Sequence, residues 1–196
     1  TWEGVPIISG DASDLTIEEC FFYNINNRKQ YLVFWNGQTG SEVNIVSSRF
    51  MLSGGIFIDG DVNTSNIVNS SWVNEDTSIP YAGDRIVNNA IGDMNIIAST
   101  FMWNSNVCST CQDYLFESKV GKINFIESAV GINYPGSASD NLNTLGGTGT
   151  GFTADLYTWI QPTTSQDAAT LKTITSQPNL LTGADAFNTP ITSSST

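Results

Sequence analysis

The 196-residue sequence contains no histidine, and this absence excludes several classes of function. A Ser-His-Asp triad, a Cys-His dyad, a histidine-ligated metal and a histidine pH switch all need an imidazole. Bases are also few: 7 Lys and Arg stand against 19 Asp and Glu, which gives a net charge of −12. So acidic a chain cannot neutralise nucleic-acid phosphates and is repelled by anionic membranes. We therefore expect neither nucleic acid nor an anionic membrane as a partner.

Long apolar runs are missing too, so we expect no membrane span. The N-terminus has no basic region and no apolar signal core. It begins with Thr1, and we expect a processed chain or a fragment. Apolar residues nevertheless make up 40% of the sequence and aromatic residues 11%, which is enough to form a core. The abundance of Ser, Thr and Asn, together with the acidic balance, favours an extracellular location.

The feature that organises the sequence is a repeat of 22 to 29 residues. Its apolar anchor residues are Ile17, Ile45, Ile67, Ile96 and Phe125, separated by 28, 22, 29 and 29 residues. A small residue lies three positions after each anchor: Cys20, Ser48, Ser70, Ser99 and Ser128. An aromatic or apolar residue lies five positions after it: Phe22, Phe50, Trp72, Phe101 and Val130. A polar residue precedes each anchor: Thr16, Asn44, Asn66, Asn95 and Asn124.

These columns predict a parallel β-helix rather than a leucine-rich repeat. Leu is scarce, and alternation such as Val43/Ile45 is typical of strands. The alternation changes parity before the small residue, which predicts a bend in each coil. We expect an all-β solenoid of about five coils over residues 1–132, with the anchor and aromatic columns inside and the Asn column forming a ladder of hydrogen bonds. Residues 133–196, rich in Ser, Thr and Gly, are interpreted as a C-terminal cap, linker or assembly segment.

The difference in repeat length falls at one corner of the coil, after the aromatic column. Loops that accumulate along one edge of a solenoid often form its binding face. The candidate binding edge contains Tyr23, Tyr81 and Trp103, whose rings can stack on a neutral glycan or fill a pocket of another protein. Trp35 is a further candidate for stacking on sugars. For Trp35, Tyr81 and Trp103, packing under the loop edge is the alternative interpretation.

The sequence offers few candidates for catalysis or metal binding. The close acid pairs, Asp59/Asp61 and Glu75/Asp76, are interpreted as turn and surface acids rather than as the two carboxylates of a glycosidase. Zinc would need four ligands, whereas the chain has three cysteines in all. We therefore expect no metal, no cofactor and no catalytic residue.

Two kinds of modification are expected. Cys108 and Cys111 lie in one of the long loops, and we expect them to form a local disulfide, with Cys20 a buried free thiol in the small-residue column. The triplets beginning at Asn63 and Asn69 match the N-glycosylation motif and are candidate acceptors in a eukaryotic secreted protein.

The repeat resembles those of polymorphic outer-membrane-protein adhesins and related extracellular β-helix proteins. The resemblance rests on Gly54-Gly55-Ile56-Phe57, on strands such as Leu15-Thr16-Ile17, and on endings such as Phe101-Met102-Trp103-Asn104. It implies a right-handed single-stranded β-helix with an adhesive or structural role, and it supplies no catalytic residues.

We therefore expect a non-enzymatic extracellular structural or adhesion module on a cell or virion surface, and consider that it forms one subunit of a fibre or filament. Its expected partners are neighbouring copies, a neutral glycan or a surface protein. The alternative is a tailspike-like or pectin-lyase-like β-helix that binds or cleaves a polysaccharide.

Overall fold

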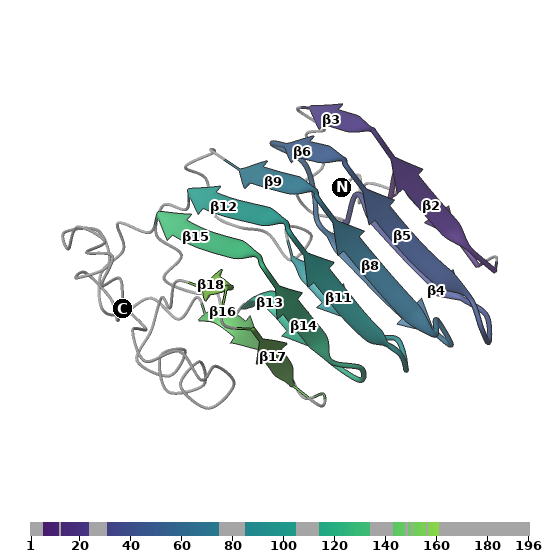
Figure 1. Cartoon of the computed structure of the whole chain (residues 1–196). Helices are drawn as coiled ribbons and strands as arrows, with labels where there is room; N and C mark the ends of the chain where they lie inside the picture. Colours follow the sequence, from purple (N-terminus) through teal and green to yellow (C-terminus); the bar gives the residue numbers. More distant parts are fainter. Residues whose placement is uncertain are drawn as a thin grey trace, which may run out of the picture.

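The structure, a computed structural model, describes residues 6–11, 13–23, 31–74, 85–104, 114–133, 143–147, 149, 151–155 and 157–160. Within these ranges the chain contains strands and no helix. The strands form three parallel sheets of six strands each, so the prediction of an all-β parallel solenoid is confirmed. Each successive coil adds one strand to every sheet, and Figure 1 shows the resulting stack.

We name the sheets A, B and C in the order in which each coil enters them. Sheet A contains β1 (Ile8–Gly10), β4 (Val33–Gly37), β7 (Ile56–Gly60), β10 (Ile86–Asn88), β13 (Tyr114–Ser118) and β16 (Asn143–Gly146). Sheet B contains β2 (Leu15–Glu18), β5 (Glu42–Val46), β8 (Thr64–Val68), β11 (Asp93–Ile97), β14 (Ile123–Ile126) and β17 (Phe152–Ala154). Sheet C contains β3 (Phe21–Tyr23), β6 (Arg49–Met51), β9 (Ser71–Asn74), β12 (Thr100–Asn104), β15 (Ala129–Asn133) and β18 (Trp159–Ile160).

The predicted interior columns are confirmed in register. In sheet B, Ile17, Ile45, Ile67, Ile96 and Phe125 are paired coil on coil and all are buried. In sheet C, Phe22, Phe50, Trp72, Phe101 and Val130 follow one another in the same way. The rings of Phe50 and Trp72 are stacked, with 4.2 Å between their centroids. Like residues occupy like positions because every coil presents the same shape to the next.

The Asn column forms the predicted ladder on the outer surface of sheet B. The Asn66 amide donates to Asn44 Oδ1, Asn95 to Asn66, and Asn124 to Asn95, with N–O distances of 2.9 to 3.0 Å. At the C-terminal end, the Thr153 hydroxyl donates to Asn124 Oδ1. Each amide satisfies its neighbour, so the ladder fixes the register of sheet B.

The bend between sheets B and C has a repeated geometry. The residue before the small one has a positive φ of 47° to 52° in Glu19, Ser47, Asn69, Ala98 and Glu127. The small residue that follows bridges two coils: Ser99 Oγ accepts from the Ser70 amide at 3.1 Å and donates to the carbonyl of Ile97 at 2.8 Å. Ser48, Ser70 and Ser128 make the same bonds. The column is small because this hydroxyl lies buried at a tight corner.

The solenoid extends beyond the residue at which the sequence columns end. Strands β16, β17 and β18 pair with β13, β14 and β15 and add a sixth layer to each sheet. In this layer Ala154 follows the anchor column and Ile160 the aromatic column. Strands within residues 143–160 therefore add a sixth described layer to the stack, where the sequence alone predicted about five coils.

Candidate interaction surface

The variable corner lies between sheet C and sheet A, as the spacing of the repeat predicts. The chain leaves sheet C after Tyr23, Met51, Asn74, Asn104 and Asn133 and enters sheet A at Val33, Ile56, Ile86, Tyr114 and Asn143. The corner between β6 and β7 is the short one, with Leu52 at a φ of 52°. Every connection of unequal length therefore starts and ends along the same edge.

Of the predicted binding edge, Tyr23 is an exposed residue of β3, with 58% of its surface accessible. Trp103 belongs to β12, and its side chain lies outside the described residues, as does all of Tyr81. The suggestion that Trp35 stacks on sugars is wrong. Its side chain is 7% exposed and packs inside the solenoid beside Gly10, where an added Cβ would come within 2.6 Å of the indole.

The modification sites are placed only in part. Cys108 and Cys111 lie outside the described residues, so their disulfide stays a prediction. Cys20 is a free thiol, but it is half-buried rather than buried, because it lies in the first coil of the stack. Its Sγ donates to the carbonyl of Glu18 at 3.3 Å. Asn63 and Asn69 are both exposed, at the corner after sheet A and the corner after sheet B.

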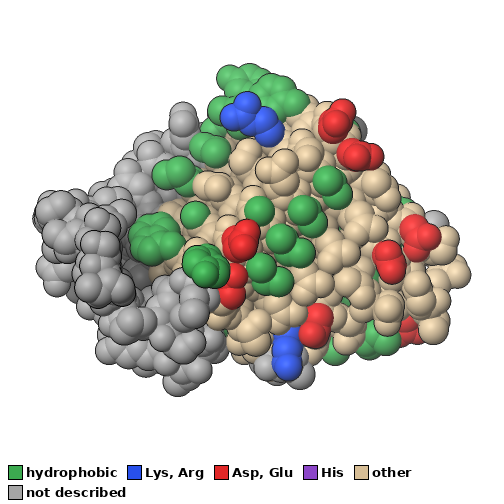
Figure 2. Space-filling model, in the orientation of Figure 1, with side chains coloured by type: hydrophobic (Ala, Val, Ile, Leu, Met, Phe, Trp, Pro, Cys, Tyr) green, Lys and Arg blue, Asp and Glu red, His purple; other side chains and the backbone are tan. Residues whose placement is uncertain are grey.

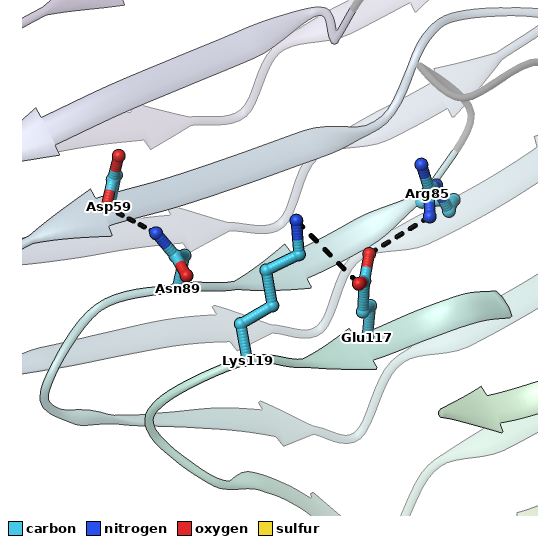
Figure 3. A network of polar contacts seen from close by, with 5 residues as sticks. All are labelled: Asp59, Arg85, Asn89, Glu117 and Lys119. Carbon is cyan, nitrogen blue, oxygen red and sulfur yellow. Dashed lines mark hydrogen bonds and ion pairs between the residues drawn. The ribbon is translucent and has the colours of Figure 1, made fainter. Parts of the chain in front are cut away.

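The outer surface of sheet A carries a network of charged side chains, which Figure 3 shows, and a group of aromatic rings beside it. Arg85 and Lys119 both pair with Glu117, at 3.0 and 3.7 Å. The Lys119 ammonium also lies 5.2 Å from the centre of the Phe57 ring, against which the rings of Phe34 and Tyr31 pack. These groups engage one another, and the side chains of Arg85 and Glu117 are only 16% and 12% exposed. This surface is built mainly from internal contacts.

The acids near this network have separate partners. Asp59 Oδ1 accepts from the Gly60 amide at 2.8 Å and from the Asn89 side chain at 2.7 Å (Figure 3). Asp61 Oδ2 accepts from the Thr39 hydroxyl at 3.0 Å. The described residues include no group of three or more potential metal ligands. Asp59 and Asp61 thus both hold hydrogen bonds beside the corner after sheet A, and their interpretation as turn and surface acids stays a prediction; Glu75 and Asp76 lie outside the described residues.

Sheet C has a different outer surface, which we call the C face. It consists of two outward rows that flank the buried aromatic column. The first row is Phe21, Arg49, Ser71, Thr100, Ala129 and Trp159, and the second is Tyr23, Met51, Val73, Met102 and Gly131. Phe21, Tyr23, Met102 and Trp159 are 60%, 58%, 52% and 40% exposed. Figure 2 shows hydrophobic side chains spread over the side of the molecule formed by sheets B and C.

Local packing makes the C-terminal part of the C face an apolar platform. At Gly131 an added Cβ would lie 3.5 Å from the Trp159 ring and 3.9 Å from the Met102 methyl group. Both side chains therefore lean over the glycine from neighbouring coils. At the N-terminal end, Phe21 and Tyr23 are stacked with 6.0 Å between ring centroids. The C face thus carries exposed apolar groups at both ends of the stack.

The C face is also free of acids. Its two outward rows contain Arg49 and no Asp or Glu, although the whole chain carries 19 acids. Acids lie beside it at the corner with sheet B: Glu19 precedes Phe21 and Glu127 precedes Ala129, each by two residues, and the Asp155 carboxylate accepts from the Glu127 amide. Across the same corner, sheet B adds the outward residues Val46, Val68, Ile97 and Ile126. Contiguous exposed apolar area of this kind is typical of interaction sites.

Sequence analysis identified Tyr23 but missed the rest of the C face. The signal lies in the residues on either side of the aromatic column, because alternation along a strand places both neighbours outward. The bend between sheets B and C decides which residues of each sheet C strand face outward, because it changes the parity of the alternation.

Searches of family models, curated proteins and solved structures find no match to this chain, so the adhesin resemblance stays an expectation. Among the described residues, no helix is long and apolar enough to cross a membrane.

Proposed function

We propose that the protein is a non-enzymatic structural or adhesion module of an extracellular surface, which acts by apolar contact through its C face. The observation that carries this proposal is the exposure of Phe21, Tyr23, Met102 and Trp159 on one regular sheet. A parallel stack with hydrogen-bonded corners holds these side chains at fixed spacing, so little ordering entropy is lost on contact. A protein surface is the partner that such a face fits best.

Methionine oxidation tests this proposal, because the chain has three methionines in three environments. Met102 is exposed and Met51 half-buried on the C face, whereas Met94 is fully buried in the core. In dilute isolated protein, mild peroxide should oxidise Met102 first, then Met51, and Met94 last. In material taken from its source, Met102 and Met51 should be protected. Equal oxidation of Met102 in both samples contradicts the proposal.

A matched pair of variants tests the same point. Met102→Ser should weaken the affinity of the protein for the partner surface that covers the C face about tenfold, as removal of one central apolar contact does. Ile91→Ser is the control, because Ile91 is 61% exposed but lies at the corner after sheet A. It should leave association unchanged.

A second candidate function is binding of a neutral polysaccharide on sheet A, which the half-buried rings of Tyr31, Phe34 and Phe57 favour. Phe57→Ser would then abolish retention on a polysaccharide column, and Met102→Ser would not. We rank this function second because the rings already pack against one another and against Lys119.

A further inference from the structure

We infer that the C face binds the C face of a second copy of this chain, around a two-fold axis that runs parallel to the strands between the third and fourth coils. This inference rests on the proposed function, since it names the partner of the same surface. The residues along the C face are complementary to one another when a second copy faces the first with its order of coils reversed.

The reversal pairs coil one with coil six, two with five, and three with four. An isologous contact has this property, because a residue that faces another is faced by it in return. In the first row, Phe21 then meets Trp159, Arg49 meets Ala129, and Ser71 meets Thr100.

The second row matches in size in the same way. Met51 of one copy meets Gly131 of the other, and Val73 meets Met102. The apolar platform over Gly131 thus receives a methionine side chain, and thioether groups pack well against aromatic rings such as that of Trp159. Arg49 and Met51 thus face the small residues Ala129 and Gly131, and Phe21 faces the flat ring of Trp159, while the position opposite Tyr23 lies outside the described residues.

Charge selects a second copy over a random acidic surface. Two molecules of net charge −12 repel, and an acid-free face is where they can approach. Arg49 is exposed, and no carboxylate among the described residues pairs with it. In the reversed arrangement it lies beside Ala129 of the other copy, two residues from Glu127, which is exposed at the corner. Arg49 of each copy can therefore pair with Glu127 of the other, so the two-fold symmetry forms two such ion pairs.

The size of the C face sets the expected strength. Five spacings between six strands give a length of about 24 Å, and strands of two to five residues give a mean width of about 12 Å. The flat area of about 300 Å² per copy is below the roughly 800 Å² of a standard interface. We therefore expect a weak dimer that forms with rising concentration and stops at two copies.

Sedimentation equilibrium from about 10 µM to about 1 mM tests the inference over the affinity range of weak complexes. Arg49→Glu and Glu127→Arg should each weaken the dimer about tenfold, because each reverses two equivalent ion pairs. The double variant should restore it. Lys122→Glu is the matched control, since it changes the net charge as Arg49→Glu does but lies at an exposed position after sheet A, and it should have little effect.

Three results would overturn the inference: a monomer throughout the range, assembly beyond two copies, or a dimer that neither charge variant weakens. The first leaves the proposed function standing if Met102 is still protected in material from the source, because another protein then covers the C face. If instead Met102 is oxidised equally in both samples but the double variant of Arg49 and Glu127 restores the dimer, the dimer forms through the C face and the proposed function is wrong.

Discussion

Removal of the Ser99 hydroxyl tests the corner between sheets B and C most directly. Ser99 is buried, and its Oγ accepts from the Ser70 amide at 3.1 Å and donates its one proton to the carbonyl of Ile97 at 2.8 Å, with the carbonyl of Ile67 also within reach at 3.2 Å. The carbonyl of Ile97 keeps a second donor, the Asn69 amide at 3.0 Å. Among the described residues, the Ser70 amide has no other acceptor. Ser99→Ala therefore leaves one buried N–H without a partner.

An unsatisfied buried amide costs about 1–3 kcal/mol, so we expect Ser99→Ala to lower the free energy of unfolding by about 2 kcal/mol. The assay is urea unfolding, with a lower midpoint and an unchanged slope. Amide exchange at Ser70 should also become faster than at the corresponding Ser48 amide, which keeps its bond to Ser70 Oγ.

Two controls separate this effect from general loss of packing. Ser99→Thr keeps a hydroxyl, and Thr158 already occupies this column in the terminal layer, where it accepts from the Ser128 amide at 3.2 Å. Ser47→Ala is the second control: it removes an exposed hydroxyl two coils away along the same edge, which accepts from the exposed Asn69 side chain rather than from a buried amide. If Ser99→Ala changes stability by less than about 0.5 kcal/mol, as surface changes do, the bridging role assigned to the column is wrong.

Three further predictions concern the same stack. Ile96→Ala, in the centre of the anchor column, should cost about 2–5 kcal/mol in urea unfolding, and a near-neutral result would contradict its interior position. Ala98→Gly should raise stability by up to about 1 kcal/mol in the same assay, because φ is 47° and glycine adopts this conformation without the Cβ clash; destabilisation would refute the strain argument. Burial raises the pKa of Asp155. Hydrogen bonds from the Thr158 hydroxyl and from the Glu127, Tyr157 and Thr158 amides lower the pKa by more than burial raises it, so the net shift is downward. Because the folded-state pKa is depressed, the stabilisation is present above the ordinary carboxyl pKa and is lost as the pH falls through the lowered pKa. The difference in unfolding free energy between wild type and Asp155→Asn should therefore shrink below about pH 4. A difference that stays constant with pH would contradict this.

The interior of the solenoid could be predicted because its columns repeat residue types. Ile45, Ile67 and Ile96 face the same neighbours, so the same side chain suits each position. The left-handed corner could not be predicted in this way. Glu19, Ser47 and Ala98 share a backbone conformation rather than a chemical property, and none is glycine.

The sixth layer was missed for a different reason. Its anchor Ala154 is followed by Thr158 in the small-residue position and by Ile160 in the aromatic position, each one residue later than in the other coils. The extra residue falls at the corner, where the Asp155 carboxylate takes the place of a backbone carbonyl and accepts from the Glu127 amide at 3.2 Å. The corner hydrogen bond is kept while the residue spacing changes by one, so the spacing of the other coils does not predict this layer.

The C face differs from every other column in that folding does not require its apolar character. The interior columns must be apolar to form a core, and the Asn column is held by its ladder. Among the described side chains, the two outward rows of sheet C make no hydrogen bond to the next coil, and Ser71 and Thr100 show that small polar residues fit there. Phe21, Met102 and Trp159 nevertheless occupy equivalent positions with 40% to 60% of their surface in water. Their contacts with one another, over Gly131 and between Phe21 and Tyr23, leave this much apolar surface in water, and this is the observation on which the proposed contact rests.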